Sequence, residues 1–239
     1  MTTTVSPPRT SRHIRQMFAE IAGQYDLINR LMTFGQDRVW RQCVIQAAAM
    51  PENGIVLDVG TGTGGIALDL LEEDNTLQVI GADFTVDMMR IGRQKQNNSR
   101  VTWIETDALA LPFRDARFDA ITSGYLVRNV SDALQAFQEQ ARVVKPGGRV
   151  VCLETSPPPK GLLQPVLLLF LNRLIPLLGQ VVSGNRPAYT YLPQTTQNFL
   201  SPGKVSAVMR SAGLINIRYR QFMFGTIAVH VGIRPENHG

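Results

Sequence analysis

Cysteine is scarce in this chain, whose 239 residues include only Cys43 and Cys152. The distance between them along the sequence fits neither a metal site nor a redox pair. Cys152 lies within an apolar, strand-like run, where a free thiol usually packs as a small hydrophobic side chain. We therefore expect no metal site and no thiol chemistry.

Lysine is also rare, with four residues against twenty arginines. The formal net charge is +5, and the arginines are scattered along the chain instead of forming runs. This pattern does not predict a nucleic-acid-binding groove. Two interpretations of the basic charge stay open, an ordinary solvated surface or a face that lies near an anionic membrane.

The chain has no apolar segment near its start, where residues 1–10 read MTTTVSPPRT. We therefore expect no secretory signal and a cytoplasmic protein. The longest apolar stretch, 161–172, ends at Arg173 and is shorter than the roughly twenty residues of a membrane-spanning helix. Because Pro165 and Pro176 lie nearby, we predict a kinked apolar helix that caps the domain without spanning a bilayer.

The hydrophobic content of 44% suits one globular domain of this length. We predict a disordered tail at residues 1–10 and helices at 11–50 that cover the site. The main domain is expected at 51–239, with an apolar helical insertion at about 160–200.

Strand and helix patterns alternate through the main domain. We predict strands at 55–59, 78–82, 101–105, 118–123 and 149–154, and helices at 66–71, 86–96 and 131–144. Near-continuous apolar strands in such an alternation indicate a parallel sheet with helices on both faces. A helix at 202–212 precedes two more strands, 215–223 and 226–233, whose short connection predicts an antiparallel pair.

A glycine-rich turn, DVGTGTG, follows the first predicted strand at residues 58–64. Glycines between a strand and a helix let a ligand approach the backbone closely. The pattern Gly60-x-Gly62-x-Gly64 is also found in tight turns that bind nothing. It lacks the lysine of a phosphate-binding loop.

Three acids each lie at or just after the end of a predicted strand, and such ends meet at one crevice in a doubly wound sheet. Asp58 precedes the glycines, where its carboxylate can bind an amine or a water. Asp83 comes about twenty residues later, the usual place for an acid that binds ribose. Asp107 can accept from an adenine amino group, with the amide of Ala108 beside it. A crevice rich in acids suits a sulfonium cation, so we predict S-adenosylmethionine (SAM) as the cofactor.

Four longer segments occur together in the chain. They are YDLINRLMTFGQDRVW (25–40), VRNV (127–130), RVVKPGGRVVCLETS (142–156) and AYTYLP (188–193). With these segments the chain resembles the ubiquinone/menaquinone biosynthesis C-methyltransferases, the UbiE/MenG type, over about residues 12–233. The resemblance implies a class I methyltransferase fold: a Rossmann-like, seven-stranded, mostly parallel sheet with a C-terminal antiparallel strand and a helical cap.

The resemblance also implies SAM-dependent methylation of a ring carbon of a polyprenylated hydroquinone, in menaquinone or ubiquinone biosynthesis. It adds Thr63 to the predicted cofactor contacts Asp83, Asp107 and Ala108. The Arg-Asn pair of the family falls on Arg128 and Asn129, where the substrate ring should approach the sulfonium methyl. Tyr25 and Tyr189 resemble the aromatic residues that line the substrate pocket.

The chain departs from the family pattern at several positions. Gly65 stands where relatives commonly carry an acid, and Asp37 where they usually have histidine. Gly124 replaces a serine, and Tyr125-Leu126-Val127 replaces a Phe-Gly-Leu-like run. The last two changes touch the substrate pocket and leave the acceptor open, with a phenol or a sterol as the alternative.

A hydroquinone carbon becomes nucleophilic when a neighbouring hydroxyl loses its proton. Arg128 is suited to stabilising the resulting oxyanion, because a guanidinium group does not deprotonate. His13 and His230 are more typical of structural or exposed histidines, so the general base stays unassigned. A regulatory subunit without turnover and a nicotinamide dehydrogenase are the remaining alternatives.

The leucine-rich cap at 161–182 has several open interpretations. It can line a channel for an isoprenoid tail, rest on the inner face of the membrane as a peripheral contact, or pack as a core helix. The sequence leaves a homodimer open as well.

Overall fold

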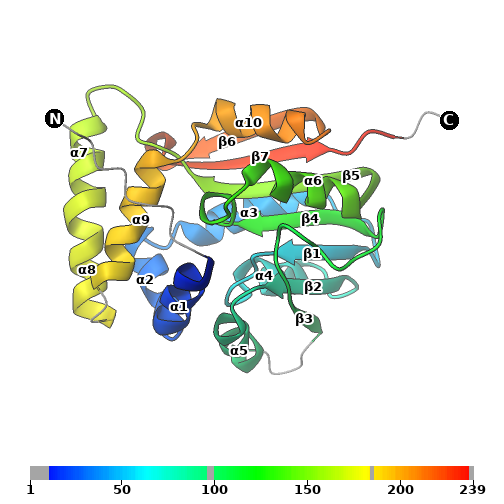
Figure 1. Ribbon diagram of the computed structural model, residues 1–239, viewed down its shortest axis with the longest axis horizontal. Coiled ribbons are helices and arrows are strands. Elements are labelled where there is room, and N and C mark those ends of the chain that lie inside the picture. The colour runs from blue at the N-terminus through cyan, green and yellow to red at the C-terminus, as the bar shows by residue number, and fades with distance from the viewer. Residues whose placement is uncertain (1–10, 96–99, 184–185, 237–239) are drawn as a thin grey trace.

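The computed structural model describes residues 11–95, 100–183 and 186–236. The disordered tail expected at residues 1–10 lies outside these ranges. Within them, the strands form one seven-stranded sheet in the order β3-β2-β1-β4-β5-β7-β6 (Figure 1). The strands are β1 (Ile55–Val59), β2 (Gln78–Asp83), β3 (Val101–Glu105), β4 (Phe118–Gly124), β5 (Val144–Thr155), β6 (Ile215–Phe222) and β7 (Ile227–Ile233).

Strands β1 to β5 pair in parallel, and β7 pairs antiparallel with both β5 and β6. Residues 56–59 of the central strand β1 are all buried, as expected for a strand covered on both faces. The predicted mostly parallel sheet with an antiparallel C-terminal strand is therefore confirmed. Its parallel strands end on the side where Figure 1 shows α1, α2 and α7 to α9.

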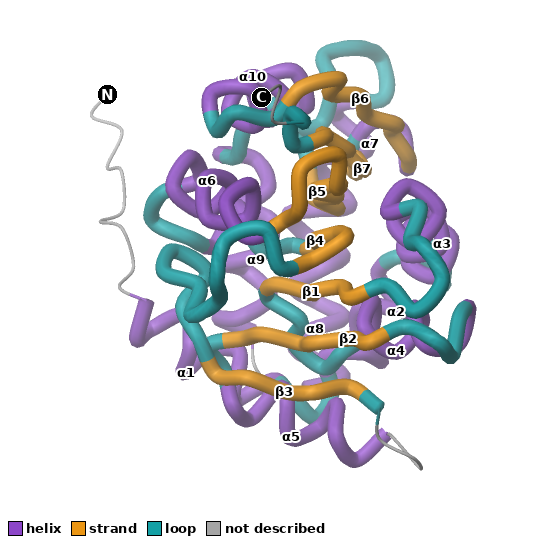
Figure 2. Tube along the Cα trace, turned by 90° about the vertical axis from the view of Figure 1, so that its right-hand side faces the viewer, coloured by secondary structure: helices purple, strands orange, loops and turns teal. Residues whose placement is uncertain are grey.

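Helices cover both faces of the sheet. Helices α6 (Ala133–Val143) and α10 (Pro202–Ser211) lie on one face, and α3 (Asp37–Ala48) and α4 (Gly65–Glu73) lie on the other (Figure 2). Helix α5 (Val86–Lys95) lies near the β3 edge (Figure 1). Asp132 caps α6 by accepting the Gln135 amide at 3.0 Å.

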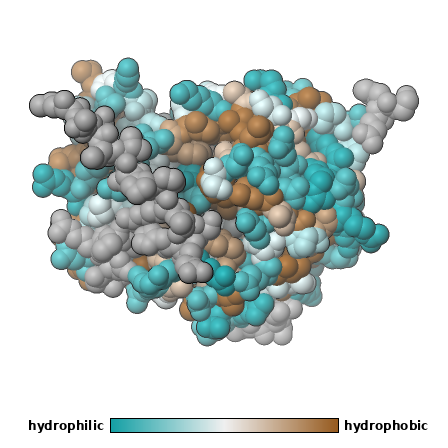
Figure 3. All heavy atoms as spheres, viewed as in Figure 1, coloured by the Kyte–Doolittle hydropathy of each residue, from teal (hydrophilic) through white to brown (hydrophobic). Residues whose placement is uncertain are grey.

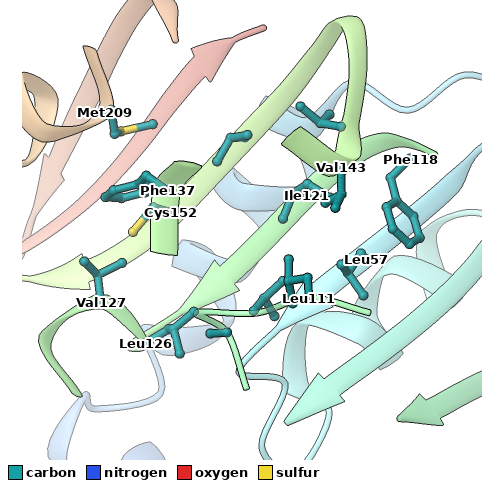
Figure 4. Packing of buried hydrophobic residues seen from close by; sticks show 14 of the residues in the cluster. Leu57, Leu111, Phe118, Ile121, Leu126, Val127, Phe137, Val143, Cys152 and Met209 are labelled. Carbon is teal, nitrogen blue, oxygen red and sulfur yellow. The ribbon is translucent and has the colours of Figure 1, made fainter. Parts of the chain in front are cut away.

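The core between the sheet and the α6–α10 layer is apolar and closely packed (Figure 4). Phe137 of α6 and Met209 of α10 pack with Ile121 of β4 and Cys152 of β5, all of them fully buried. Cys152 thus packs as a small hydrophobic residue, and burial raises its pKa. Removing a buried aromatic ring such as that of Phe137 costs about 3 to 5 kcal/mol in cores of this kind.

Further helices lie at the carboxyl ends of the parallel strands. These are α1 (Ser11–Ile21), α2 (Tyr25–Met32), α7 (Gln164–Leu169), α8 (Ile175–Ser183) and α9 (Arg186–Asn198). Ile21, Ile28, Leu171 and Ile175 form a separate apolar cluster there, together with Tyr189. The sequence predicted no separate helix for α2 or α9. Through this cluster α2 packs against α8. Helix α9 forms although Pro193 lies within it.

The apolar segment is longer than the sequence predicted. The helix continues from α7 through a π-helical turn at Phe170–Leu174 into α8. This turn accommodates Pro176, which has no N–H to donate to the helix. The stretch Gln164–Val182 has 19 residues, and an 18-residue window within it has a mean hydropathy of 1.7 and is 22% buried. By length and composition alone it is able to cross a membrane, because the helix is longer than the stretch 161–172; that it caps the domain without spanning a bilayer stays a prediction.

Candidate active site

The glycine turn is anchored to the end of the neighbouring strand. The amides of Gly60 and Thr61 donate to the carbonyl of Ala82 at 2.7 and 3.0 Å, and the amide of Gly62 donates to a carboxylate oxygen of Asp83 at 2.8 Å. Gly60, Gly62 and Gly64 all have positive φ, at 69°, 55° and 79°. Only glycine adopts this conformation without strain, so the turn exposes its backbone to a ligand.

Asp58 and Asp83 are both buried beside this turn. The Thr122 hydroxyl donates to Asp58 at 2.7 Å, and the Thr85 amide donates to Asp83 at 2.7 Å. Burial raises the pKa of Asp58 from 3.8 to about 6, with Asp83 adding to the effect. Burial also raises the pKa of Asp83, against the hydrogen bonds that its carboxylate accepts. Two desolvated carboxylates beside one turn favour a cation there.

Asp107 and Ala108 lie in the loop after β3. Asp107 is exposed and accepts the Leu109 amide at 2.9 Å, while Ala108 is buried. The loop is joined to the site because the Thr106 amide donates to the carbonyl of Asp83 at 3.1 Å. Neither Asp107 nor Ala108 lines the two cavities beside the glycine turn, so their part in binding adenine stays a prediction.

The larger cavity has a volume of about 460 Å³ and extends from the glycine turn to the apolar helices. Its polar end contains Asp58, Gly60, Gly62 and Thr63. Its other end is lined by side chains of the insertion and of the last hairpin, namely Leu167, Phe170, Leu171, Ile175, Leu192, Met223 and Ile227. One cavity therefore joins the predicted cofactor turn to an apolar chamber.

A smaller cavity of about 50 Å³ lies on the other side of the turn. Asp83, Phe18 of α1 and Tyr25 of α2 line it, and Tyr25 lines the larger cavity too. The ring of Phe18 meets that of Tyr25 edge to face, with their centroids 6.1 Å apart. Helices α1 and α2 thus cover the cofactor turn, and Tyr25 stands between the two cavities.

Helix α2 is attached to the glycine turn by polar contacts. The Thr63 hydroxyl donates to Asp26 at 2.6 Å, and Lys95 of α5 forms an ion pair with Asp26. Lys95 also donates to the carbonyl of Thr63 at 3.1 Å. Thr63 therefore lies at the site, and its hydroxyl is already engaged by a residue that the sequence did not single out.

Arg128 follows β4 and lines the larger cavity. Its guanidinium group forms a buried ion pair with Glu154, whose side chain is 1% exposed, and lies 5.0 Å from the centroid of the Tyr125 ring. Arg128 thus lies at the cavity while its role in catalysis stays a prediction, and the sequence did not single out Glu154. The signal was present, because Glu154 stands near the end of β5 just as Asp58 and Asp83 stand near the ends of β1 and β2.

The side-chain amide of Asn129 is already engaged by other protein groups. Its amide group donates to the carbonyl of Tyr125 at 2.8 Å and accepts from the Tyr191 hydroxyl at 3.0 Å. Asn129 lines the smaller cavity. Tyr189, the predicted substrate residue of α9, packs against Gly179 of α8 and lines neither cavity. Within that segment it is Tyr191 that reaches the Arg128–Asn129 pair.

Two positions that depart from the family pattern meet at one arginine. Arg41 of α3 donates to Asp37 at 2.5 Å and to Asp69 of α4 at 2.6 Å. A Cβ atom at Gly65 would lie 3.5 Å from the Arg41 side chain. Arg41, Asp37 and Gly65 all line the larger cavity. Arg41 therefore joins α3 to α4 through two ion pairs at the wall of this cavity.

His230 supplies no base at the cavity. It is buried in β7, where its Nε2 lies 3.0 Å from the carbonyl of Pro202, and burial lowers its pKa. The side chain of His13 lies outside the described part of the chain. Among the described residues, no group of three or more His, Cys, Asp and Glu side chains is arranged to hold a metal ion.

The residues beside the glycine turn fit SAM. The positive-φ glycines let the cofactor approach the backbone, and the desolvated acids Asp58 and Asp83 suit its positive charges. Asp83 retains lone pairs for ribose hydroxyls beyond the two amides that it already accepts. These features support the cofactor that the sequence predicted.

Comparison with known proteins agrees with this geometry. A model of the ubiE/COQ5 methyltransferase family matches residues 8–234. The demethylmenaquinone methyltransferase of Thermus thermophilus is 44% identical over 221 residues, which are 92% of this chain and 100% of that protein. The ubiquinone/menaquinone biosynthesis C-methyltransferase UbiE of Desulfotalea psychrophila is 42% identical over 92% of this chain and 90% of its own length.

A solved structure shares the fold. It is Haemonchus contortus phosphoethanolamine N-methyltransferase 2 in complex with S-adenosyl-L-methionine, which has a TM-score of 0.64 and 15% identity and covers 97% of this chain and 59% of that chain. At this identity the likeness shows the fold alone. The family model and the two relatives show the family: the chain belongs to the ubiE/COQ5 methyltransferase family and has the fold of a class I methyltransferase.

Proposed function

We propose that this protein transfers a methyl group from SAM to a ring carbon of a polyprenylated hydroquinone, with demethylmenaquinol as the first candidate. The observation that carries the proposal is the larger cavity. It joins the cofactor turn at Gly62 to an apolar chamber lined by Phe170 and Ile175, and Arg128 lies in its wall. Such a cavity suits a substrate with a polar, redox-active ring and a long apolar tail.

Different residues bind the cofactor and stabilise the negative charge that grows on the substrate. Asp58, Asp83 and the glycine turn hold the cofactor, and Tyr25 lies where the two cavities meet. Arg128 donates to a ring oxygen as its negative charge grows, which raises the nucleophilicity of the neighbouring carbon. The surrounding apolar side chains exclude water and keep this interaction strong.

Bound SAM supplies an electrophilic methyl group, and the electron pair of the broken carbon–sulfur bond stays on sulfur. The substrate ring carbon provides the electron pair for the new carbon–carbon bond and afterwards loses its proton to water. Overall, one proton is released for each methyl group transferred. Positioning the ring carbon against the methyl group is the main contribution that a cavity of this shape makes to the rate.

We further infer that the apolar face of α7 and α8 contacts the membrane surface while the substrate tail enters. Its exposed side chains include Val181 of α8 at 76%, and Leu162, just before α7, and Phe34, just after α2, adjoin it at 99% and 71%. Phe34 lies against Phe170, whose ring centroid is 6.0 Å away. Brown spheres at the left edge of Figure 3 mark part of this face, where Figure 1 places α7 and α8.

Exposed cations accompany this apolar face. Lys160 precedes α7, Arg173 lies within the helix, and Arg30 of α2 is exposed at the wall of the larger cavity. Basic side chains beside exposed leucines favour an anionic membrane interface. Sedimentation with vesicles tests this contact. Vesicles that contain phosphatidylglycerol should retain the protein, and a variant with serine at Leu162 and Val181 should remain in the supernatant.

The methylation itself is tested with purified protein and labelled SAM. We expect label in the quinol fraction when demethylmenaquinol is supplied, and none when simple phenols or sterols are supplied. Transfer to a phenol oxygen or to a sterol, without transfer to a quinol, would identify another acceptor class. Absence of transfer to all acceptors, with S-adenosylhomocysteine (SAH) still bound, would indicate a binding subunit without turnover.

A further inference from the structure

The carboxylate of Glu154 is the centre of a buried polar cluster behind the larger cavity. One oxygen, Oε1, accepts from the Arg128 guanidinium Nη1 and from the Thr155 amide at 2.8 Å. The other oxygen, Oε2, accepts from the backbone amide of Arg128 at 3.2 Å. Glu154 therefore holds both the side chain and the main chain of Arg128, and the two side chains are only 1% and 4% exposed.

One donor of the Arg128 guanidinium group, Nε, is buried and has no hydrogen-bond partner within the described ranges of the chain. A buried donor without an acceptor is unfavourable, because it has lost its water and gained nothing in return, so such atoms call for an explanation. Arg128 lines the larger cavity, so a ligand bound there is close to this unsatisfied donor.

We propose that Glu154 is a positioning residue for methyl transfer, which holds Arg128 by one edge and leaves its Nε–H for the oxygen of the methyl acceptor. The proposal rests on the function proposed above and deepens it. Glu154 does not line the cavity, so it acts through Arg128 and not on the substrate directly. Without the carboxylate, the guanidinium group is free to rotate and to turn other donors toward the cavity.

Glu154 also sets the charge of the acceptor site. The net charge of the Arg128–Glu154 pair is zero, so the site can bind a quinol in its neutral, protonated form. The Nε–H bond then strengthens as negative charge grows on the acceptor oxygen, which favours the transition state over the bound substrate. An unpaired guanidinium group would instead lower the pKa of any hydroxyl beside it, by about 1 to 3 units for a close charge.

The other titratable groups that face Arg128 are neutral over the pH range of the assays. Tyr125 comes from the same loop and Tyr25 from α2, and burial raises the pKa of both. Burial opposes the charge of Arg128, but the carboxylate of Glu154 outweighs it, and the pKa of Arg128 is raised. The remaining charged residues of the cavity wall are Asp26, Arg30, Asp37, Arg41, Asp58, Asp69 and Lys95. They are common to every variant below, so differences among the variants report on Glu154.

The first variant is Glu154→Gln, which keeps the shape of the side chain and removes its charge. We expect kcat at about pH 8 to fall about tenfold or more, with the KM for SAM within about twofold of wild type. The acid limb of kcat should move to lower pH by about one unit, because Arg128 is then unpaired. Glu154→Asp is the second variant. It keeps the charge but shortens the reach, so kcat should fall while the acid limb stays in place.

Glu139→Gln is the matched control. Glu139 also pairs with an arginine, Arg142 at 2.8 Å, but on α6 and away from both cavities. This variant should lose some stability and keep the wild-type kcat and pH profile. If Glu154→Gln behaved like Glu139→Gln, with kcat and acid limb unchanged per folded molecule, Glu154 would be structural only and the proposal would be wrong.

A second measurement needs no turnover. A hydroxynaphthoquinone whose ionised form absorbs visible light is titrated while bound to each protein in the presence of SAH. Its pKa should be about one unit lower on Glu154→Gln than on wild type and nearly unchanged on Glu154→Asp. If Glu154→Gln does not fold, Glu154→Asp still tests the proposal, since a kcat equal to that of wild type would overturn it.

The two measurements separate this proposal from the proposed function. If the wild-type protein methylated no quinol but the pKa of the bound probe fell in Glu154→Gln as expected, the reaction would be misassigned and the role of Glu154 would stand. If the wild-type protein methylated a quinol and the pKa of the probe did not change in Glu154→Gln, the function would stand and the charge role of Glu154 would fall. Failure of the wild-type protein to bind the probe would overturn the acceptor site itself.

Discussion

Replacing Asp58 with asparagine should stabilise the protein while it abolishes cofactor binding. Asp58 is 1% exposed, and burial raises its pKa from 3.8 to about 6. The carboxylate is therefore an unfavourable charge in the protein without its cofactor. Asparagine has the same shape, carries no charge and keeps an oxygen for the Thr122 hydroxyl, which donates to Asp58 at 2.7 Å.

The size of the effect follows from the pKa. Between pH 3.8 and about 6 the folded protein binds more protons at Asp58 than the unfolded chain does, so stability falls as pH rises through this window. A difference of one pKa unit between the folded and unfolded states corresponds to about 1.4 kcal/mol, which gives a penalty of about 2 to 3 kcal/mol above the window. The Asp58→Asn variant would not carry this penalty, so at about pH 8 its midpoint of thermal unfolding should be higher by about 5 °C or more.

Urea unfolding of the two proteins at several pH values measures the difference. The free energy of unfolding should favour Asp58→Asn by about 2 to 3 kcal/mol at about pH 8, and the gap should close toward about pH 4. Calorimetry with SAH should show the opposite ranking, since the variant lacks the negative charge for the ligand ammonium group. A variant less stable than wild type at about pH 8, or a gap that does not change with pH, would refute the reasoning.

Three further substitutions have defined outcomes. Asp83→Ala should weaken SAH binding about a hundredfold in calorimetry, because it removes a charged hydrogen-bond acceptor and releases the glycine turn; binding within about twofold of wild type would contradict its assignment. Arg128→Ala should leave SAH binding unchanged and slow methyl transfer about a hundredfold in single-turnover assays, and full activity would remove Arg128 from the mechanism. Gly64→Ala should lower the free energy of unfolding by about 1 to 3 kcal/mol, because φ is 79° there and the new Cβ would lie 2.5 Å from the Trp103 ring. An unchanged urea midpoint would show that the turn tolerates a side chain.

The sheet was the most predictable part of the molecule. Strands β1 and β3 begin and end at the predicted residues, because each is a short run rich in β-branched residues between polar or glycine-rich segments. The antiparallel order of β6 and β7 followed from their short connection. These features depend on local sequence and on the rules of parallel sheets, both of which can be read from the chain.

The helices at the cavity were less predictable because long-range packing determines them. Helix α2 has eight residues, too few to be stable alone, and depends on its contact with α8. Arg173 and Pro176 suggested that the apolar helix ends early, but the π-helical turn carries it past both. Tyr189 and Tyr191 are two positions apart on α9, so they face different directions. The sequence does not give the rotation of that helix, and it therefore could not select Tyr191.

The candidate site was predictable where an acid stands at the carboxyl end of a parallel strand. Acids at the ends of β1 and β2 identified Asp58 and Asp83, and the family segments identified Arg128. Glu154 obeys the same rule at β5, but only the structure shows that its carboxylate contacts Arg128. Pairing between distant elements of this kind sets charge and orientation at the site, and it requires coordinates.

The most direct test of the central claim is methyl transfer to demethylmenaquinol by the purified protein, followed by mass spectrometry and NMR of the product. We expect one added methyl group on a ring carbon, formed together with one equivalent of SAH. A methyl group on a quinol oxygen, or an unchanged quinol in the presence of bound SAM, would contradict it.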